Sequence, residues 1–205
     1  MATVIAYVSS SIDILEAARL WEALPWSCFV PSLRVDMISF LNGKKAVIRS
    51  RSYNRFEKID IVLKKFNINF LFDDKGYVFF AKDQNLLQKA FELDISPYSH
   101  EVEFGKLLGY PLCCIRKIKS LGEINIDKYS EKFSQELLRN DADDHLNIKF
   151  YEQGIALISH IPCSTNCSES LSLAYSNKKI IDTMLYIKKG DKWLKKVSAF
   201  YGKDN

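Results

Sequence analysis

The pattern of apolar and polar residues divides the first half of the chain into short strands and capped helices. Runs of β-branched and aromatic residues predict strands at 3–10 and 44–50, and a hairpin at 69–82 that turns around Asp74 to Gly76. Helices are predicted where a capping side chain precedes apolar residues at three- and four-residue spacing. The first helix starts with the capping pair Ser10 and Asp13 and runs up to Pro25. The second starts with the capping pair Asn54 and Glu57 and runs to Phe66, and the third runs from the cap Asp83 through Leu93.

The second half has mainly helical patterning. Ser99 can cap a helix at 100–108, Gly109 ends it in a left-handed turn, and Pro111 opens a second helix that stops at Gly122. Further helices are predicted at 127–139, after Pro162 with Ser164 or Asn166 as the cap, and at 190–203. The run 148–161 between them is strand-like at its end.

These elements predict an α+β fold. A mixed sheet with helices occupies the N-terminal half, 1–94, and the C-terminal half, 95–205, is mainly helical. The two halves either form separate subdomains or pack as a single domain.

Composition and charge indicate a folded protein but do not identify its binding partner. The 205 residues are 47% apolar and 26% charged, so the chain can bury a core and fold. Its formal net charge of +4 permits an anionic substrate, a nucleic acid or a peptide as partner without requiring one. The N-terminus lacks the pattern of a secretory signal, and no apolar run reaches the roughly 18 residues of a membrane span. We therefore expect a soluble, cytoplasmic protein without membrane contact, and its oligomeric state stays open.

Four of the five cysteines lie in two short segments, KLLGYPLCCIRKI at 106–118 and SHIPCSTNCSES at 159–170. In a reducing cytosol, cysteines at such close spacing indicate metal binding or catalysis more often than disulfides. Both pairs fall at predicted helix starts, where free N–H groups and the helix dipole favour the thiolate form. The fifth cysteine, Cys28, lies far from both segments in the sequence and is interpreted as a small buried apolar residue.

The spacing of these residues predicts one shared site. His160, Cys163 and Cys167 form an H-x2-C-x3-C pattern that a turn can aim at one ion, with a fourth ligand from Cys113 or Cys114. Adjacent helical residues diverge by about 100°, so we expect only one of these two cysteines in a single-metal site. A sulfur of one segment should then lie within about 4 Å of a sulfur of the other.

Several kinds of chemistry fit this constellation. Cysteines could bind an iron–sulfur cluster with an open iron, or His160 with cysteines could bind Zn²⁺ and a water. Without a metal, Cys163 could be a nucleophile with His160 as its base, and Cys113 a further reactive thiol. The leading hypothesis is a small metal- or thiol-dependent enzyme. One alternative is a non-enzymatic binding module with a structural Cys/His site. The other is that Cys114 and Cys167 are only small buried residues of the core.

The two segments also resemble a known family. LGYPLCC, followed some fifty residues later by HIPCSTNCSES, is similar to the signature of the prokaryotic domain-of-unknown-function family 483. The resemblance covers roughly 100–174 and rests on residues of both segments: Gly109, Tyr110, Pro111, Cys113, Cys114, His160, Pro162, Cys163, Cys167 and Ser170. It implies no activity, only that these positions form one unit. Leu112 stands where a carboxylate is often found, which weakens an acid or base role at that position.

Overall fold

The computed structural model describes residues 13–53, 59–96, 98, 100–139 and 144–202. Its strands are β1 (Val47–Arg51), β2 (Asn69–Phe72) and β3 (Tyr77–Ala81). Its α-helices are α1 (Ile14–Ala23), α2 (Leu33–Leu41), α3 (Ile59–Lys65), α4 (Gln84–Ile95), α5 (Glu101–Leu107), α6 (Leu112–Leu121), α7 (Ile126–Arg139), α8 (Ser168–Ile187) and α9 (Lys192–Phe200). Short 3-10 turns lie at Trp26–Cys28, Glu123–Asn125 and Asp144–Leu146. The predicted α+β fold is confirmed, with the strands in the N-terminal part and helices elsewhere.

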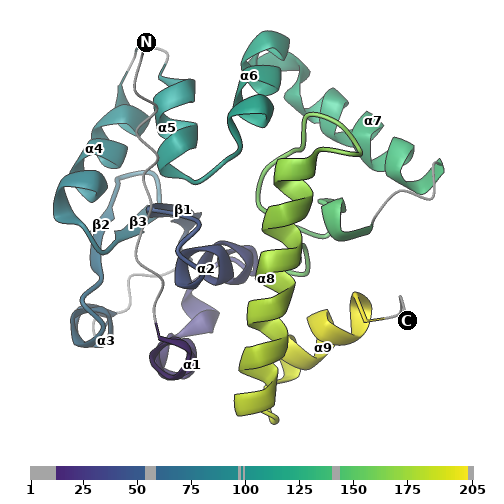
Figure 1. Cartoon of the computed structure of the whole chain (residues 1–205). Helices are drawn as coiled ribbons and strands as arrows, with labels where there is room; N and C mark the ends of the chain where they lie inside the picture. The colour runs from purple at the N-terminus through teal and green to yellow at the C-terminus, as the bar shows by residue number, and fades with distance from the viewer. Residues whose placement is uncertain (1–12, 54–58, 97, 99, 140–143, 203–205) are drawn as a thin grey trace, which may run out of the picture.

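The sheet separates two layers of helices. Its strand order is β1-β3-β2 and both pairings are antiparallel, with Val47 opposite Ala81 and Ile48 opposite Phe80. Because side chains alternate along a strand, Phe80 and Ile48 enter the main core, while Phe79 and Ala81 pack toward α4 and α5. Figure 1 shows the sheet between α4 and α5 on one side and α1, α2 and α3 on the other.

The expected mixed sheet is therefore antiparallel throughout in the residues that the structure describes. β2 and β3 form the predicted hairpin, and β1, which precedes α3 in the chain, pairs with the other edge of β3. β1 and β2 do run parallel to each other, but β3 lies between them, so no parallel ladder forms. The strand predicted at 3–10 lies outside the described residues.

Aspartates begin three of the helices. Asp13 accepts hydrogen bonds from the backbone N–H groups of Leu15 and Glu16 at the start of α1. Asp83 and Asp191 cap α4 and α9 in the same way. These bonds satisfy N–H groups that have no partner within the helix, which is why the predicted starts near these aspartates are confirmed. The predicted caps Ser10, Asn54 and Ser99 lie outside the described residues.

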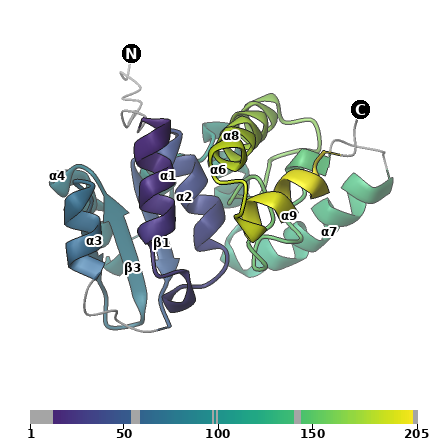
Figure 2. The ribbon, with the colours of Figure 1, turned by 90° about the horizontal axis from the view of Figure 1, so that it is seen from below.

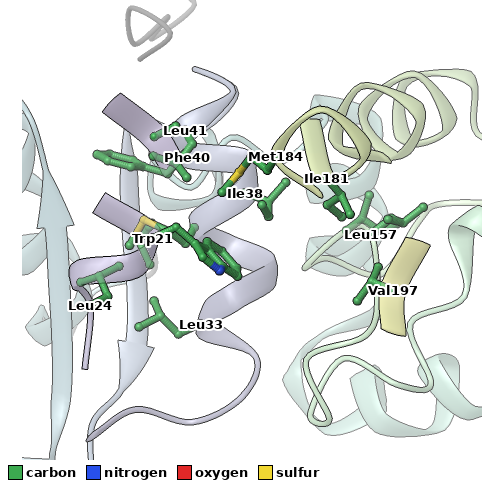
Figure 3. Packing of buried hydrophobic residues seen from close by; sticks show 14 of the residues in the cluster. Trp21, Leu24, Leu33, Ile38, Phe40, Leu41, Leu157, Ile181, Met184 and Val197 are labelled. Atoms are coloured by element: carbon green, nitrogen blue, oxygen red, sulfur yellow. The ribbon is translucent and has the colours of Figure 1, made fainter. Parts of the chain in front are cut away.

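One apolar core joins residues from both sides of the predicted boundary at 94. Trp21 of α1 and Ile38 of α2 belong to the same buried cluster as Ile181 and Met184 of α8. Figure 2 shows α1 and α2 between the sheet and α8, and Figure 3 shows Ile38 facing Met184 across this junction. Within the described chain, no helix combines the length and the apolar character needed to cross a bilayer.

The strand-like run 148–161 forms no strand. Ile155 to Ile158 are buried, which explains the apolar pattern, but they lie between helices rather than beside a strand. Their backbone groups find other partners: the Leu157 carbonyl accepts from the Asn177 side chain, and the Gly154 carbonyl accepts from the indole of Trp193. The prediction was wrong because burial alone does not show whether a sheet edge is available.

The turn between α5 and α6 is fixed by a glycine. Gly109 has a φ of +71° and ends α5 as predicted, and Pro111 then precedes α6 as its N-cap. A Cβ atom on Gly109 would lie 2.1 Å from the carbonyl oxygen of Lys44. The turn can therefore approach the backbone before β1 this closely only because residue 109 has no side chain.

Replacing Gly109 should destabilise the protein more than an ordinary glycine substitution. In Gly109→Ala the left-handed backbone alone costs roughly 1–2 kcal/mol. The Lys44 carbonyl must also move, so we expect a loss above about 3 kcal/mol in the free energy of unfolding, measured by urea denaturation. Gly190→Ala is the control, because Gly190 has open space around it and no positive φ. Equal stability of the two variants would contradict the close approach.

Candidate metal centre

Four cysteine sulfurs converge on one point. The Sγ atom of Cys167 lies 3.7 Å from those of Cys113 and Cys114, which are 3.8 Å from each other. With Cys163, all four sulfurs lie within 4.8 Å of one another. We call these four side chains the thiol cluster. The prediction that a sulfur of one segment lies within about 4 Å of a sulfur of the other is confirmed.

Two helix starts supply three of the four thiols. Cys113 and Cys114 are the second and third residues of α6, and Cys167 is the N-cap of α8. Neither helix has a side-chain oxygen that caps its first turn. Figure 1 shows the first turn of α6 beside the first turn of α8. The positive ends of both helix dipoles therefore face the cluster, where they favour negative charge on sulfur.

The structure brings both adjacent cysteines to the cluster, contrary to the expectation that only one of them can join. The expectation considered only the 100° between neighbouring side chains around the helix axis. Side chains also tilt toward the N-terminus of their helix, so Cys113 and Cys114 both reach the space beyond the start of α6. A ligand site placed off the end of a helix can therefore use consecutive residues.

The predicted caps of α8 have another role. Ser164 donates a hydrogen bond to the side chain of Asn166, 2.9 Å away, and α8 begins only after Cys167. The loop from Ile161 to Asn166 instead directs Cys163 toward α6, where its backbone N–H donates to the sulfur of Cys114 at 3.3 Å.

His160 does not join the thiols but lies behind them. Its Nε2 atom is 2.8 Å from the hydroxyl of Ser170, and that hydroxyl is 3.3 Å from the sulfur of Cys114. Its ring stacks at a tilt against Tyr110, with 5.4 Å between ring centroids. Only 7% of His160 is exposed, and its buried Nδ1 atom has no hydrogen-bond partner among the described residues. The metal-binding and catalytic roles predicted for His160 remain predictions.

Burial and hydrogen bonds set the protonation of the cluster. Burial, together with hydrogen bonds to Cys167 and Cys163, raises the pKa of Cys113 to about 12, and burial also raises the pKa of Cys114. Burial opposes ionisation of Cys167 too, but hydrogen bonds from Ser170 and the neighbouring thiols lower its pKa to about 7. Without a metal, a thiolate at Cys167 would thus lie beside the protonated thiols of Cys113 and Cys114.

A metal fits this set of donors. Thiolates that lie 3.7–3.8 Å apart repel one another, and a cation between them removes that repulsion while replacing the protons. Four cysteines are ligands both of zinc and of iron–sulfur clusters. The thiol cluster is therefore compatible with a metal ion or an iron–sulfur site.

Other contacts bind the two cysteine segments into one unit. The hydroxyl of Tyr129 on α7 lies 2.9 Å from the carbonyl oxygens of both Pro162 and Cys163. Burial, together with the neighbouring Cys163 and Cys114, raises the pKa of Tyr129 to about 12, so this hydroxyl stays a donor. Tyr129 was missed in the sequence, because nothing in the charged repeat of α7 distinguishes it.

A buried ion pair supports the site from the N-terminal half. Lys45 lies 2.6 Å from Asp36, and the second oxygen of Asp36 accepts a hydrogen bond from Tyr151 at 2.7 Å. The ammonium group of Lys45 also lies 4.7 Å from the ring centroid of Tyr110, which in turn stacks on His160. Sequence reasoning missed this pair, since Asp36 and Lys45 look like ordinary surface charges.

The fifth cysteine stands apart as expected. Cys28 is partly buried and packs against the main apolar core, and it does not belong to the thiol cluster.

Comparisons with known proteins agree with the resemblance of the two segments. A family model described as "Protein of unknown function (DUF483)" matches residues 87–195, which is more than half of the chain. Neither the curated proteins nor the solved structures include a match to this chain.

The convergence of the thiols can be tested by oxidation. Treating metal-depleted protein with diamide should join the tryptic peptide 107–116, which carries Cys113 and Cys114, to peptide 150–178, which carries Cys163 and Cys167. Mass spectrometry of the digest detects this product. Cys28 is the internal control and should stay reduced or react only slowly. Cross-links that involve mainly Cys28 would contradict the arrangement.

Proposed function

The chain belongs to the DUF483 family, whose description assigns no activity, and on that premise we propose that it is a zinc-stabilised binding protein. In this proposal one Zn²⁺ bound by the thiol cluster fastens α6 to the start of α8. The fastened elements then form the wall of an apolar cavity in which a ligand binds.

The spacing of the sulfurs carries the zinc assignment. Zinc in structural sites is tetrahedral with Zn–S bonds near 2.3 Å, so two of its ligand sulfurs lie about 3.8 Å apart. The three sulfur–sulfur separations among Cys113, Cys114 and Cys167 are 3.7, 3.7 and 3.8 Å. These three values match the ligands of a single ion, and the sulfur of Cys163 lies within 4.8 Å of the other three.

An iron–sulfur cluster is less well supported by the same distances. In a four-iron cluster each cysteine binds a different iron, so the ligand sulfurs surround the whole cluster and lie farther apart than those of one ion. Sulfurs that all lie within 4.8 Å leave little room for several iron and sulfide atoms between them.

The number of thiols favours a structural role over a catalytic one. Catalytic zinc usually keeps three protein ligands and an open position, whereas four cysteines close the coordination sphere. The enzyme hypothesis requires a free thiolate at Cys163 or Cys113, or His160 as a ligand beside a water. These roles stay predictions, as does the binding of an anionic substrate, a nucleic acid or a peptide. No contact among the described residues supports them.

The cavity beside the cluster supports ligand binding. It has a volume of about 350 Å³, and it is lined by residues of α5 and α6 and of the loop before Cys163. Cys114 and His160 form part of its wall. A concave, mainly apolar space of this size with a few polar groups is typical of a small-molecule site.

Metal analysis tests the proposal directly. Protein purified without oxygen should contain one zinc per chain and absorb no visible light. After exchange with Co²⁺, the spectrum should show the intense bands of tetrahedral thiolate coordination. A brown protein that contains several irons per chain, or a protein without bound metal, would contradict the zinc assignment.

Single substitutions should separate ligands from neighbours. Cys113→Ser, Cys114→Ser, Cys163→Ser and Cys167→Ser should each weaken zinc affinity by more than about 100-fold and lower the melting temperature. His160→Gln should weaken it by about 10-fold at most, because Gln can still donate to Ser170. Chelator competition measures these affinities, and Cys28→Ser is the control with unchanged zinc content. A His160 variant as damaging as the cysteine variants would indicate that His160 is a ligand.

A further inference from the structure

The thiol cluster is not equally accessible on all sides. Cys114 and Cys167 are only 1% and 6% exposed, whereas Cys113 and Cys163 are partly buried. The sulfur of Cys113 also lies 3.7 Å from a carboxylate oxygen of Glu169, whose side chain is exposed. A small molecule in solution therefore reaches Cys113 and Cys163 before it reaches the other two sulfurs.

Zinc leaves these sulfurs open to oxidation, and this step rests on the function proposed above. A cysteine ligand of zinc is a thiolate, which is also the form of cysteine that attacks oxidants. Zinc has no redox chemistry of its own, so an oxidant reacts with sulfur and not with the metal. Since oxidation follows thiolate character and exposure, Cys113 and Cys163 are the two candidates for first attack.

The surroundings of these two cysteines favour Cys113. It lies in the first turn of α6, where the positive end of the helix dipole stabilises a thiolate, whereas Cys163 lies in the loop before α8. That loop is held by the hydrogen bond from Tyr129 to the Cys163 carbonyl and by the bond from the Cys163 N–H to the sulfur of Cys114. A disulfide from Cys163 to Cys167 would also stay within one segment and would not link α6 to α8.

Geometry selects the partner of Cys113. Its sulfur lies 3.7 Å from that of Cys167 and 3.8 Å from that of Cys114. Consecutive Cα atoms are about 3.8 Å apart, below the roughly 4.4 Å at which disulfides begin, so a bond between Cys113 and Cys114 would distort α6. Cys167 belongs to another element, and its sulfur needs to come only about 1.7 Å closer to reach the length of an S–S bond.

We propose that Cys113 is a peroxide-sensitive modification site with Cys167 as its partner, and that their oxidation releases the zinc while a disulfide keeps α6 joined to α8. The sulfur of Cys113 attacks one peroxide oxygen, the O–O bond breaks, and a sulfenic acid forms while the other oxygen leaves as hydroxide. The sulfur of Cys167 then attacks the sulfenic sulfur, the S–S bond forms, and the second oxygen leaves as hydroxide. The two sulfurs lose two electrons to the peroxide, and two protons from solvent convert both hydroxides to water.

Oxidation replaces one link between the two segments with another. The disulfide removes two of the four thiolates, and Cys114 and Cys163 alone do not complete the four ligands of a structural zinc site. Because Cys113 and Cys167 are 54 positions apart, their disulfide restricts the unfolded chain and thereby stabilises the fold without the metal.

Hydrogen peroxide tests the proposal on the full-length, zinc-loaded protein. A chromogenic zinc chelator in the solution should detect one zinc released per disulfide formed, and dithiothreitol with added zinc should restore the metal content. N-ethylmaleimide then blocks the remaining thiols, and reduction followed by iodoacetamide marks the oxidised ones. Mass spectrometry should find the iodoacetamide label on Cys113 and Cys167. The oxidised, zinc-free protein should melt at a higher temperature than the reduced, zinc-free protein.

Two variants with three cluster thiols each are compared after metal depletion. In Cys163→Ser the disulfide between the two segments should form as in the unchanged protein. In Cys113→Ser it should form at least about 10-fold more slowly, because the remaining pair, Cys114 and Cys167, is buried. Mass spectrometry of the joined tryptic peptides gives both rates. Should a variant not fold, the labelling of the unchanged protein decides the question.

The outcomes separate this inference from the zinc proposal, because metal content is measured before peroxide is added. If one zinc is bound but peroxide does not release it, or if the label marks Cys163 in place of Cys113, the inference is overturned and the zinc site stands. If the protein binds no zinc, the function proposed above and the release step are overturned together. A disulfide between Cys113 and Cys167 in that protein would still support the thiol pair.

Discussion

The close approach of four sulfur atoms is the constraint on which the arrangement of the C-terminal half depends. Ionising several thiols that lie within 4 Å of one another is unfavourable unless positive charge lies between or around them. Here the starts of α6 and α8 and the backbone N–H of Cys163 provide part of that charge. Satisfying this constraint fixes where α6 begins, how the loop before α8 runs, and how the two helices meet.

The N-terminal half reaches this site through a series of short contacts. Gly109 sets the α5–α6 turn against Lys44, and Lys45 then lies over the ring of Tyr110. Burial of the Lys45–Asp36 pair is costly by itself, and the hydrogen bond from Tyr151 offsets part of that cost. The glycine and tyrosine of the LGYPLCC segment thus position the helix that carries the thiols, which is why these residues adjoin the cysteines.

Much of this could be predicted from the sequence, but not all of it. The aspartate caps and the hairpin act through neighbouring residues, so local patterns suffice to find them. The position of His160 behind Ser170 depends on a contact ten residues apart, and the Lys45–Asp36 pair depends on how α2 meets the turn before β1. Such contacts between distant residues produce no periodic pattern in the sequence, so they cannot be found from it. The expectation that the run 148–161 is strand-like at its end failed for a related reason, because burial between helices and burial in a sheet produce the same apolar pattern.

A closed metal site can still influence a ligand that never touches the metal. With four thiolates bound, the ion has no position for a substrate, so its effect on the cavity passes through the groups that hydrogen-bond to its ligands. Cys114 is the point of contact, because it belongs to the thiol cluster and also lines the cavity. If the sulfur of Cys114 bound a metal it would carry no proton, so the hydroxyl of Ser170 would donate to this sulfur and accept from Nε2 of His160. Metal binding would in this way reach the wall of the cavity through the direction of two hydrogen bonds.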